Sequence, residues 1–184
     1  MIRKSLAVAL ILVMISGTNS FSQMQTASMM LLHSSPSLEK IRSPKDLSKY
    51  MRKNFKFVED ADNFNKVDYW QSPKEMLENK KGDCEDFAVF AHEALTELGI
   101  ESQMVSMYGK NRFAHTVTVF KQDGKYSVFN DGRLYNYDTD KIEEVLTRIE
   151  ATWIWAAYTE RKNDRGWMNG IFYNPAFQPQ KNII

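Results

Sequence analysis

The sequence predicts an α+β fold, because the period of its apolar residues changes near residue 100. Up to Gly99, apolar side chains recur at steps of three and four residues, which is typical of helices. From Glu101 onward they alternate with polar residues, which is typical of half-buried strands. The chain has 184 residues, a length that favours one domain. We therefore expect N-terminal helices, the last of which packs on an antiparallel β-sheet.

The first 22 residues have the pattern of a signal peptide. Arg3 and Lys4 precede an apolar run over 6–15, and small residues end the segment at Ser22. This run is shorter than the roughly 20 residues of a membrane span, so we expect no integral span after cleavage. An uncleaved anchor is the alternative. The sequence thus predicts a periplasmic or secreted protein, with a loose leader at 23–42 and one domain at 43–184.

Charge and cysteine content narrow the classes of function. The chain has 24 basic side chains, and loss of Arg3 and Lys4 with the signal peptide leaves 22 against 23 acidic ones. A nearly neutral chain lacks the basic surface that binds nucleic acids or anionic membranes. The single cysteine, Cys84, excludes an internal disulfide. In an exported protein we expect such a thiol to be buried or to have a chemical role.

Three helices before residue 100 are predicted from local start signals. Ser43 and Ser72 each precede a proline and are followed three residues later by an acid, which is a helix N-cap pattern. Asp83 is the expected N-cap of the third helix, which Gly99 ends. Cys84 then lies in the first helical turn, where free N–H groups and the helix dipole stabilise an anion. A polar loop is expected at 60–68.

The second half of the chain predicts strands and one further helix. Alternating patterns indicate strands at 102–108, 113–121 and 125–131. A helix is expected at 138–149, followed by an apolar strand or buried segment at 151–159. We expect the aromatic C-terminal segment, from Trp167, to pack irregularly against the domain.

The turn between the second and third of these strands decides which residue faces His115. We expect a three-residue loop over 122–124, with Gly124 in the left-handed conformation. That loop places Asp131 directly opposite His115, at a distance that lets the two side chains touch. A two-residue Asp-Gly turn would instead shift the register by one residue and turn Asp131 to the other face.

Cys84, His115 and Asp131 are the residue types of a nucleophilic triad. A thiolate attacks a carbonyl carbon, a histidine holds the thiolate and protonates the leaving amine, and a carboxylate fixes the imidazole tautomer. The backbone N–H of Cys84 is one predicted oxyanion donor, with Gln71 or the Trp70 indole as a second. The alternative for each residue is a structural role in the core.

Two stretches, "YWQSPKEMLENKKGDCED" and "HEALTELGI", resemble the transglutaminase-like superfamily. They are most similar to its bacterial cysteine peptidases, which have Trp-x-x-Pro-x-Glu leading into Gly-Asp-Cys-Glu-Asp. The resemblance covers about residues 65–136. It implies a papain/transglutaminase-like fold, a protein or peptide substrate, and Cys84, His115 and Asp131 as the catalytic triad.

The resemblance also implies a calcium site, because some family members bind calcium through the acids beside the cysteine. The matching residues here are Asp83, Glu85 and Asp86. Calcium takes oxygen ligands, so three carboxylates suit it. In the alternative, Asp83 only caps the helix and the other two acids are solvated or structural. The triad chemistry itself requires no cofactor.

The expected function is that of an exported thiol-dependent enzyme that hydrolyses peptide or isopeptide bonds through a thioester. A protein-crosslinking transglutaminase would use the same residues with an amine in place of water. A catalytically inactive binding module with this fold is the alternative of a different class. A zinc hydrolase is excluded because the sequence has no His/Cys cluster with zinc-like spacing.

Overall fold

A computed structural model describes residues 31–110 and 114–177. The predicted signal peptide, 1–22, and the first part of the leader therefore lie outside the described residues. Within the described part of the chain, no helix is both long enough and apolar enough to span a bilayer.

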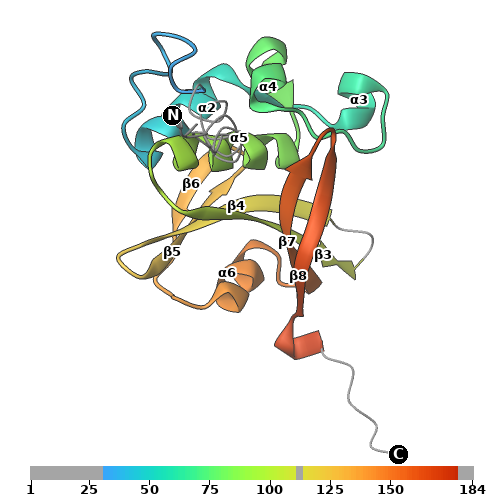
Figure 1. The fold of residues 1–184 in the computed structure, drawn as a ribbon. Helices are drawn as coiled ribbons and strands as arrows, with labels where there is room; N and C mark the ends of the chain where they lie inside the picture. The colour runs from blue at the N-terminus through green and yellow to red at the C-terminus, as the bar shows by residue number, and fades with distance from the viewer. Residues whose placement is uncertain (1–30, 111–113, 178–184) are drawn as a thin grey trace, which may run out of the picture.

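The fold is an antiparallel six-stranded sheet with helices on both faces (Figure 1), which confirms the predicted α+β class. The strand order is β6-β5-β4-β3-β7-β8. The bounds of the strands are β3 Ser102–Gly109, β4 Ala114–Gln122, β5 Lys125–Asn130, β6 Arg133–Asn136, β7 Trp153–Lys162 and β8 Arg165–Tyr173. The helices and short pieces are α2 Pro44–Asn54, β1 Lys56–Phe57, α3 Asp60–Phe64, α4 Pro73–Asn79, β2 Lys81–Gly82, α5 Cys84–Glu97, α6 Ile142–Ile149 and η2 Pro175–Phe177.

Two hydrophobic clusters, one on each face of the sheet, hold the layers together. On one face, α2 and α5 pack with Phe120 and Phe129, and the rings of Phe55 and Phe90 meet edge to face at 4.8 Å. On the other face, α6 packs around Trp153, which is completely buried. Burial of such side chains contributes about 1.5–3 kcal/mol each. The central helix α5 is therefore fixed rigidly against the sheet, and its first residue is Cys84.

The predicted helix starts are confirmed. They could be predicted because each depends on contacts between residues close in sequence. The Ser43 hydroxyl accepts a hydrogen bond from the Asp46 amide at the start of α2. At α4, Ser72 and Glu75 form the reciprocal capping box that their spacing predicts. Asp83 is the N-cap residue of α5, with an extended backbone.

Three segments differ from the expectations. In residues 31–42, expected to belong to a loose leader, Leu38 and Ile41 are buried, and the amides of Leu31 and Leu32 donate to the Glu97 carboxylate. The expected polar loop at 60–68 contains the short helix α3. The C-terminal segment, expected to be irregular, forms β8 as an edge strand beside β7.

The β4–β5 hairpin has a two-residue turn, so the expected three-residue loop is wrong. Gln122 pairs with Lys125, and Asp123 and Gly124 have positive φ angles of 50° and 77°. Two left-handed residues in sequence define the type I′ turn that Asp-Gly favours. The register is consequently shifted by one residue, and Asp131 does not lie opposite His115. Asp131 instead begins the next turn, between β5 and β6, with a φ of 46°.

Candidate active site

Cys84 is the first residue of α5 and is partly exposed. Its thiol donates a hydrogen bond of 3.1 Å to Oε2 of Glu85. Burial and the negative charge of Glu85 raise the pKa of the thiol, while the backbone amide of Thr116 lowers it. The favourable helix end that the sequence predicts is therefore outweighed by burial and by the neighbouring carboxylate.

The start of β4 lies against the start of α5. The amide of Thr116 is close enough to the Cys84 sulfur to lower its pKa. One helical turn further on, the Thr118 hydroxyl donates a hydrogen bond of 2.7 Å to the carbonyl oxygen of Ala88. The residue that precedes Thr116 is His115. The fold therefore brings the cysteine and the histidine backbone to the same end of the sheet, although they are separated by 31 positions in the sequence.

The imidazole of His115 contacts Asn130, a residue that the sequence analysis did not select. Nε2 of His115 lies 2.9 Å from Oδ1 of Asn130 at the end of β5. The expected partner, Asp131, has a half-buried carboxyl group whose Oδ1 has no hydrogen-bond partner among the described residues. Burial raises the pKa of Asp131, and the charges of His115 and Arg133 lower it. Asp131 is thus close enough to His115 for the charge of the imidazole to lower the pKa of its carboxyl group.

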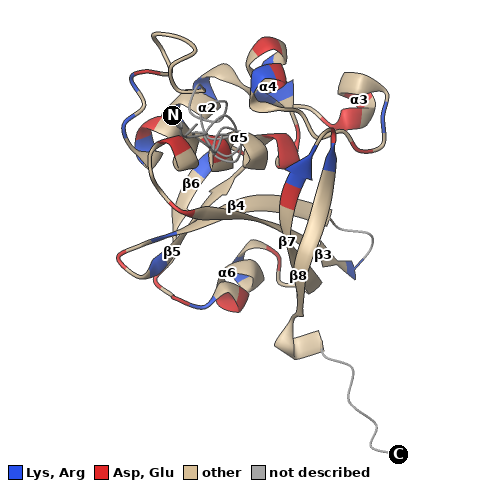
Figure 2. Ribbon diagram, viewed as in Figure 1, with Lys and Arg blue, Asp and Glu red and all other residues tan. Residues whose placement is uncertain are grey.

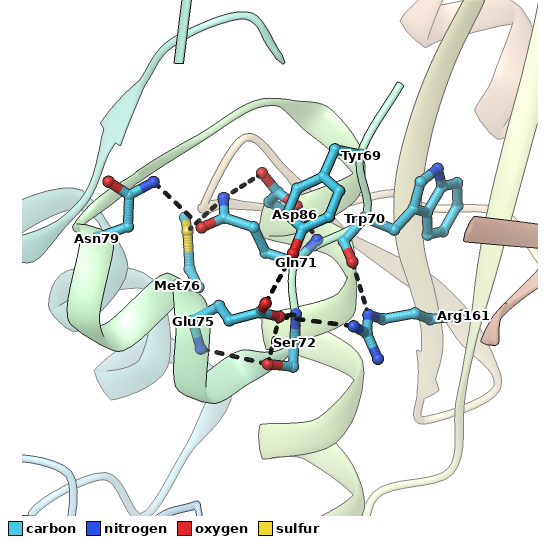
Figure 3. Close-up of polar contacts among 9 residues, drawn as sticks. All are labelled: Tyr69, Trp70, Gln71, Ser72, Glu75, Met76, Asn79, Asp86 and Arg161. Atoms are coloured by element: carbon cyan, nitrogen blue, oxygen red, sulfur yellow. Dashed lines mark hydrogen bonds and ion pairs between the residues drawn. The ribbon is translucent and has the colours of Figure 1, made fainter. Parts of the chain in front are cut away.

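The two predicted oxyanion donors are both engaged inside the protein, and Figure 3 shows the contacts of Gln71 with Asp86. Gln71 is 1% exposed, and its side-chain nitrogen donates to the carbonyl oxygen of Lys81 and to the Asp86 carboxylate. Its backbone amide donates to the same carboxylate at 2.7 Å. The Trp70 indole donates to Asp68 at 3.0 Å. Since an amide nitrogen has two hydrogens, Gln71 has no donor left for an oxyanion, and it instead holds Asp86 in place.

Five carboxylates from three segments gather around the first turn of α5: Asp60, Asp68, Asp83, Glu85 and Asp86. Figure 2 shows acidic residues on α3, on the loop that follows it and on α5. Oxygen atoms of Asp60, Asp83 and Asp86 lie within 4.8 Å of one another, as do those of Asp60, Asp68 and Glu85. The three acids beside the cysteine are those that the sequence predicts, whereas Asp60 and Asp68 are distant in sequence and carry no local signal.

The chemistry of this acidic cluster suits a hard cation. Asp60 and Asp83 are 3% and 6% exposed, yet each has a carboxylate oxygen with no hydrogen-bond partner among the described residues. Burial and mutual repulsion raise the pKa values of Asp83, Glu85 and Asp86, the last to about 7. Buried polar atoms are almost always paired. A divalent cation with oxygen ligands would satisfy these atoms and compensate their charge.

Close packing around residue 82 explains why a glycine precedes the Asp83–Cys84 pair. A Cβ atom at this position would lie 2.7 Å from Cβ of Asp86 and 2.8 Å from Nε2 of Gln71. Both distances are far below van der Waals contact. The Gln71–Asp86 contacts that support the first turn of α5 therefore require glycine at this point in the chain.

The sheet surface beside Cys84 is aromatic. The ring of Tyr108 stacks on that of Trp155, with centroids 3.9 Å apart, and its hydroxyl donates to the Met168 sulfur at 3.4 Å. Asp68, Cys84 and Glu85 raise the pKa of Tyr108 further, after burial, because their negative charges are close. Trp153 belongs to the core, as expected, whereas Trp155 lies at this surface.

Several solved structures are similar to this chain. Legionella pneumophila LapG is 20% identical over 79% of this chain and 78% of its own, with a TM-score of 0.46. Its calcium-bound form gives 18% identity over the same shares, also with a TM-score of 0.46. A crystal structure of a TGase is 16% identical over 66% of this chain and 34% of its own, with a TM-score of 0.42. Among curated proteins, none is similar enough to count as a relative.

The strongest finding is at the level of the family. The profile of the transglutaminase-like domain matches residues 23–157, which is more than half of the chain. The match includes Cys84, His115, Asn130 and Asp131. The chain therefore belongs to the transglutaminase-like domain family.

Proposed function

We propose that the protein is a thiol-dependent acyl-transfer enzyme that hydrolyses peptide or isopeptide amide bonds. The observation that carries this proposal is the meeting of α5 and β4. Cys84 begins a rigid, buried helix, and the amide of the residue after His115 lies against its sulfur. A thiol at a helix start and a histidine next to it are the minimum requirement for nucleophilic catalysis by cysteine.

The proposed reaction proceeds in two steps. The Cys84 thiol gives its proton to His115 and its sulfur attacks the carbonyl carbon of the amide. The C–N bond then breaks as His115 passes this proton to the leaving amine. The acyl group remains on the sulfur as a thioester. A water molecule then attacks the thioester, gives its proton to His115, and releases the carboxylic acid and the free thiol. With an amine in place of water, the same residues would crosslink proteins.

The developing oxyanion requires hydrogen-bond donors that are not already engaged. Because the Gln71 and Trp70 side chains donate to Asp86 and Asp68, we assign them a supporting role. The backbone N–H of Cys84 is at the first helical position, where no carbonyl of the same helix can accept from it. We infer that this N–H is the first oxyanion donor.

We also propose that the acidic cluster binds calcium through Asp60, Asp83, Glu85 and Asp86, with Asp68 beside them. A bound divalent cation would supply positive charge next to the first turn of α5. The unpaired buried oxygens of Asp60 and Asp83 support this assignment.

Export is part of the proposal. Arg3, Lys4 and the apolar run after them support a signal peptide at 1–22, with the mature protein in the periplasm or secreted. We therefore propose that the protein or peptide substrate is also periplasmic or secreted. Mass spectrometry of the mature chain tests the cleavage, because an intact Met1 would contradict it.

A catalytically inactive binding module is the second candidate, and the raised pKa of Cys84 is the observation that favours it. Alkylation of the thiol separates the two functions. Cys84 is the only cysteine, so uptake of iodoacetamide reports on this residue alone. With calcium, we expect rapid alkylation at pH values well below about 8.5, the ordinary pKa of a free thiol, and slow alkylation with a chelator.

The matched variant is His115→Ala, in which rapid alkylation with calcium should be lost. Folding of each variant is checked by circular dichroism. A thiol that stays unreactive with calcium, or that reacts equally well in His115→Ala, would contradict the enzyme and support the binding module.

A further inference from the structure

We propose that Asn130, and not Asp131, is the positioning residue that orients the His115 imidazole. This inference rests on the proposed function and names the third member of its site. Oδ1 of Asn130 lies 2.9 Å from Nε2 of His115, which is an ordinary hydrogen-bond distance. Asp131 faces His115 only in the register of a three-residue loop, and the protein does not have that register.

The register explains why residue 130 reaches the histidine. In the β4–β5 pair, Thr118 is opposite Phe129 and Val119 is opposite Val128. Continuing this pairing places Asn130 opposite Val117, on the same face of the sheet as His115 two residues earlier. Diagonal neighbours on one face are close enough for long side chains to touch. The imidazole of His115 and the carboxamide of Asn130 therefore meet across this diagonal.

Asp131 is directed elsewhere by the turn that it begins. Its backbone is left-handed, with a φ of 46°, and its side chain lines a cavity of about 420 Å³ together with Phe55, Phe87 and Arg133. Next to it, Gly132 fits closely against Phe87 and Met51. The Asp131 side chain therefore lies on the α2 and α5 side of the turn, where burial raises the pKa of its carboxyl group and the charges of His115 and Arg133 lower it.

The contact also assigns roles to the two ring nitrogens. Because Oδ1 of Asn130 accepts a hydrogen bond, Nε2 of His115 carries the proton in the neutral ring. In the proposed mechanism, Nδ1 is then assigned as the nitrogen that exchanges a proton with the Cys84 thiol. A neutral amide fixes this tautomer without placing a negative charge beside the imidazole, as a carboxylate would. Other charged groups near this end of the sheet are Glu85, Asp131 and Arg133.

The test combines ring NMR with kinetics in the full-length mature protein. With ¹⁵N-labelled histidine, the Nε2–H tautomer of neutral His115 is expected in the wild type and in Asp131→Asn, and its loss in Asn130→Ala. The signals of His33 and His92 provide internal references. For the best substrate from a fluorogenic peptide library, Asn130→Ala should lower kcat about 10–100-fold with little change in KM.

The conservative variant Asn130→Asp should restore most of kcat, because its carboxylate also accepts from Nε2, and should raise the pH of the histidine limb by about one unit. Asp131→Asn should stay within about threefold of the wild type. Loss of the tautomer in Asp131→Asn but not in Asn130→Ala would overturn the assignment and leave the proposed function intact. Failure of the proposed function is a different result, in which even His115→Ala reacts like the wild type.

Discussion

Replacement of His115 by alanine is expected to lower kcat/KM for amide hydrolysis by about 10³-fold or more. In the proposed mechanism one imidazole performs both proton transfers, so its loss removes the general base and the general acid together. The raised pKa of Cys84 makes the effect larger, because burial and the charge of Glu85 both oppose ionisation of the thiol. The measurement is the cleavage rate of the best peptide from a fluorogenic library, at saturating calcium.

His92→Ala is the matched control. His92 is also partly buried and belongs to α5, but its Nδ1 contacts the Ser102 hydroxyl at 2.8 Å. It follows Cys84 by eight residues, which is roughly 12 Å along the helix axis. This variant should cleave the peptide at nearly the wild-type rate. Equal activity losses in both variants would indicate a general effect of histidine removal on the fold, and would contradict the assigned role of His115.

The parts of this protein that could be predicted from sequence are those set by near neighbours. The caps at Ser43, Ser72 and Asp83 depend on contacts three residues away, and all three begin helices as expected. Cys84 was placed correctly at a helix start for the same reason. The change of period near residue 100 likewise predicts the order of helices and strands, because the spacing of apolar residues within each element reflects which of its faces is buried.

The register of the β4–β5 hairpin could not be derived as safely, because it depends on one residue in the turn. Asp-Gly can form a two-residue type I′ turn or part of a three-residue loop. The two options differ by a single pairing step, and that step exchanges Asn130 for Asp131 as the neighbour of His115.

The acidic cluster and β8 illustrate two further limits. Asp60 and Asp68 join the acids at Cys84 through folding of the chain between α3 and α5, which no local pattern records. In β8, both faces of the edge strand are largely exposed, and Gly166 and Gly170 interrupt the alternation. Gly166 is needed because a Cβ atom there would clash with the Trp70 indole. A functional packing constraint thus obscures the strand signal.

In the presence of a chelator, the stability of the protein is expected to fall as the pH rises from about 5 to about 8. Burial raises the pKa of Asp86 from 3.8 and that of Glu85 from 4.5, in both cases to about 7. A carboxyl group whose pKa is higher in the folded state stabilises the fold while it is protonated. This stabilisation is complete below the unfolded-state pKa and is lost as the pH rises through the folded-state pKa.

The size of the effect follows from the shifts. A shift of two to three pKa units in one group corresponds to about 3–4 kcal/mol of unfolding free energy. Glu85 and Asp86 are almost fully buried, so solvent screens their repulsion little. The measurement is the midpoint of urea unfolding at several pH values between about 5 and 8. The midpoint should decrease across this range, opposite to the usual behaviour of a protein with salt-bridged acids.

Calcium is expected to reverse this dependence of stability on pH. It binds the ionised carboxylates of the folded protein and binds the unfolded chain only weakly. With excess calcium, the midpoint at about pH 8 should equal or exceed that at about pH 5. Asp86→Asn should flatten the curve in chelator, since it removes one titrating group while an amide oxygen still accepts from the Gln71 amide. A midpoint that rises with pH in chelator would contradict the raised pKa values. A midpoint that does not change when calcium is added would contradict the metal site alone.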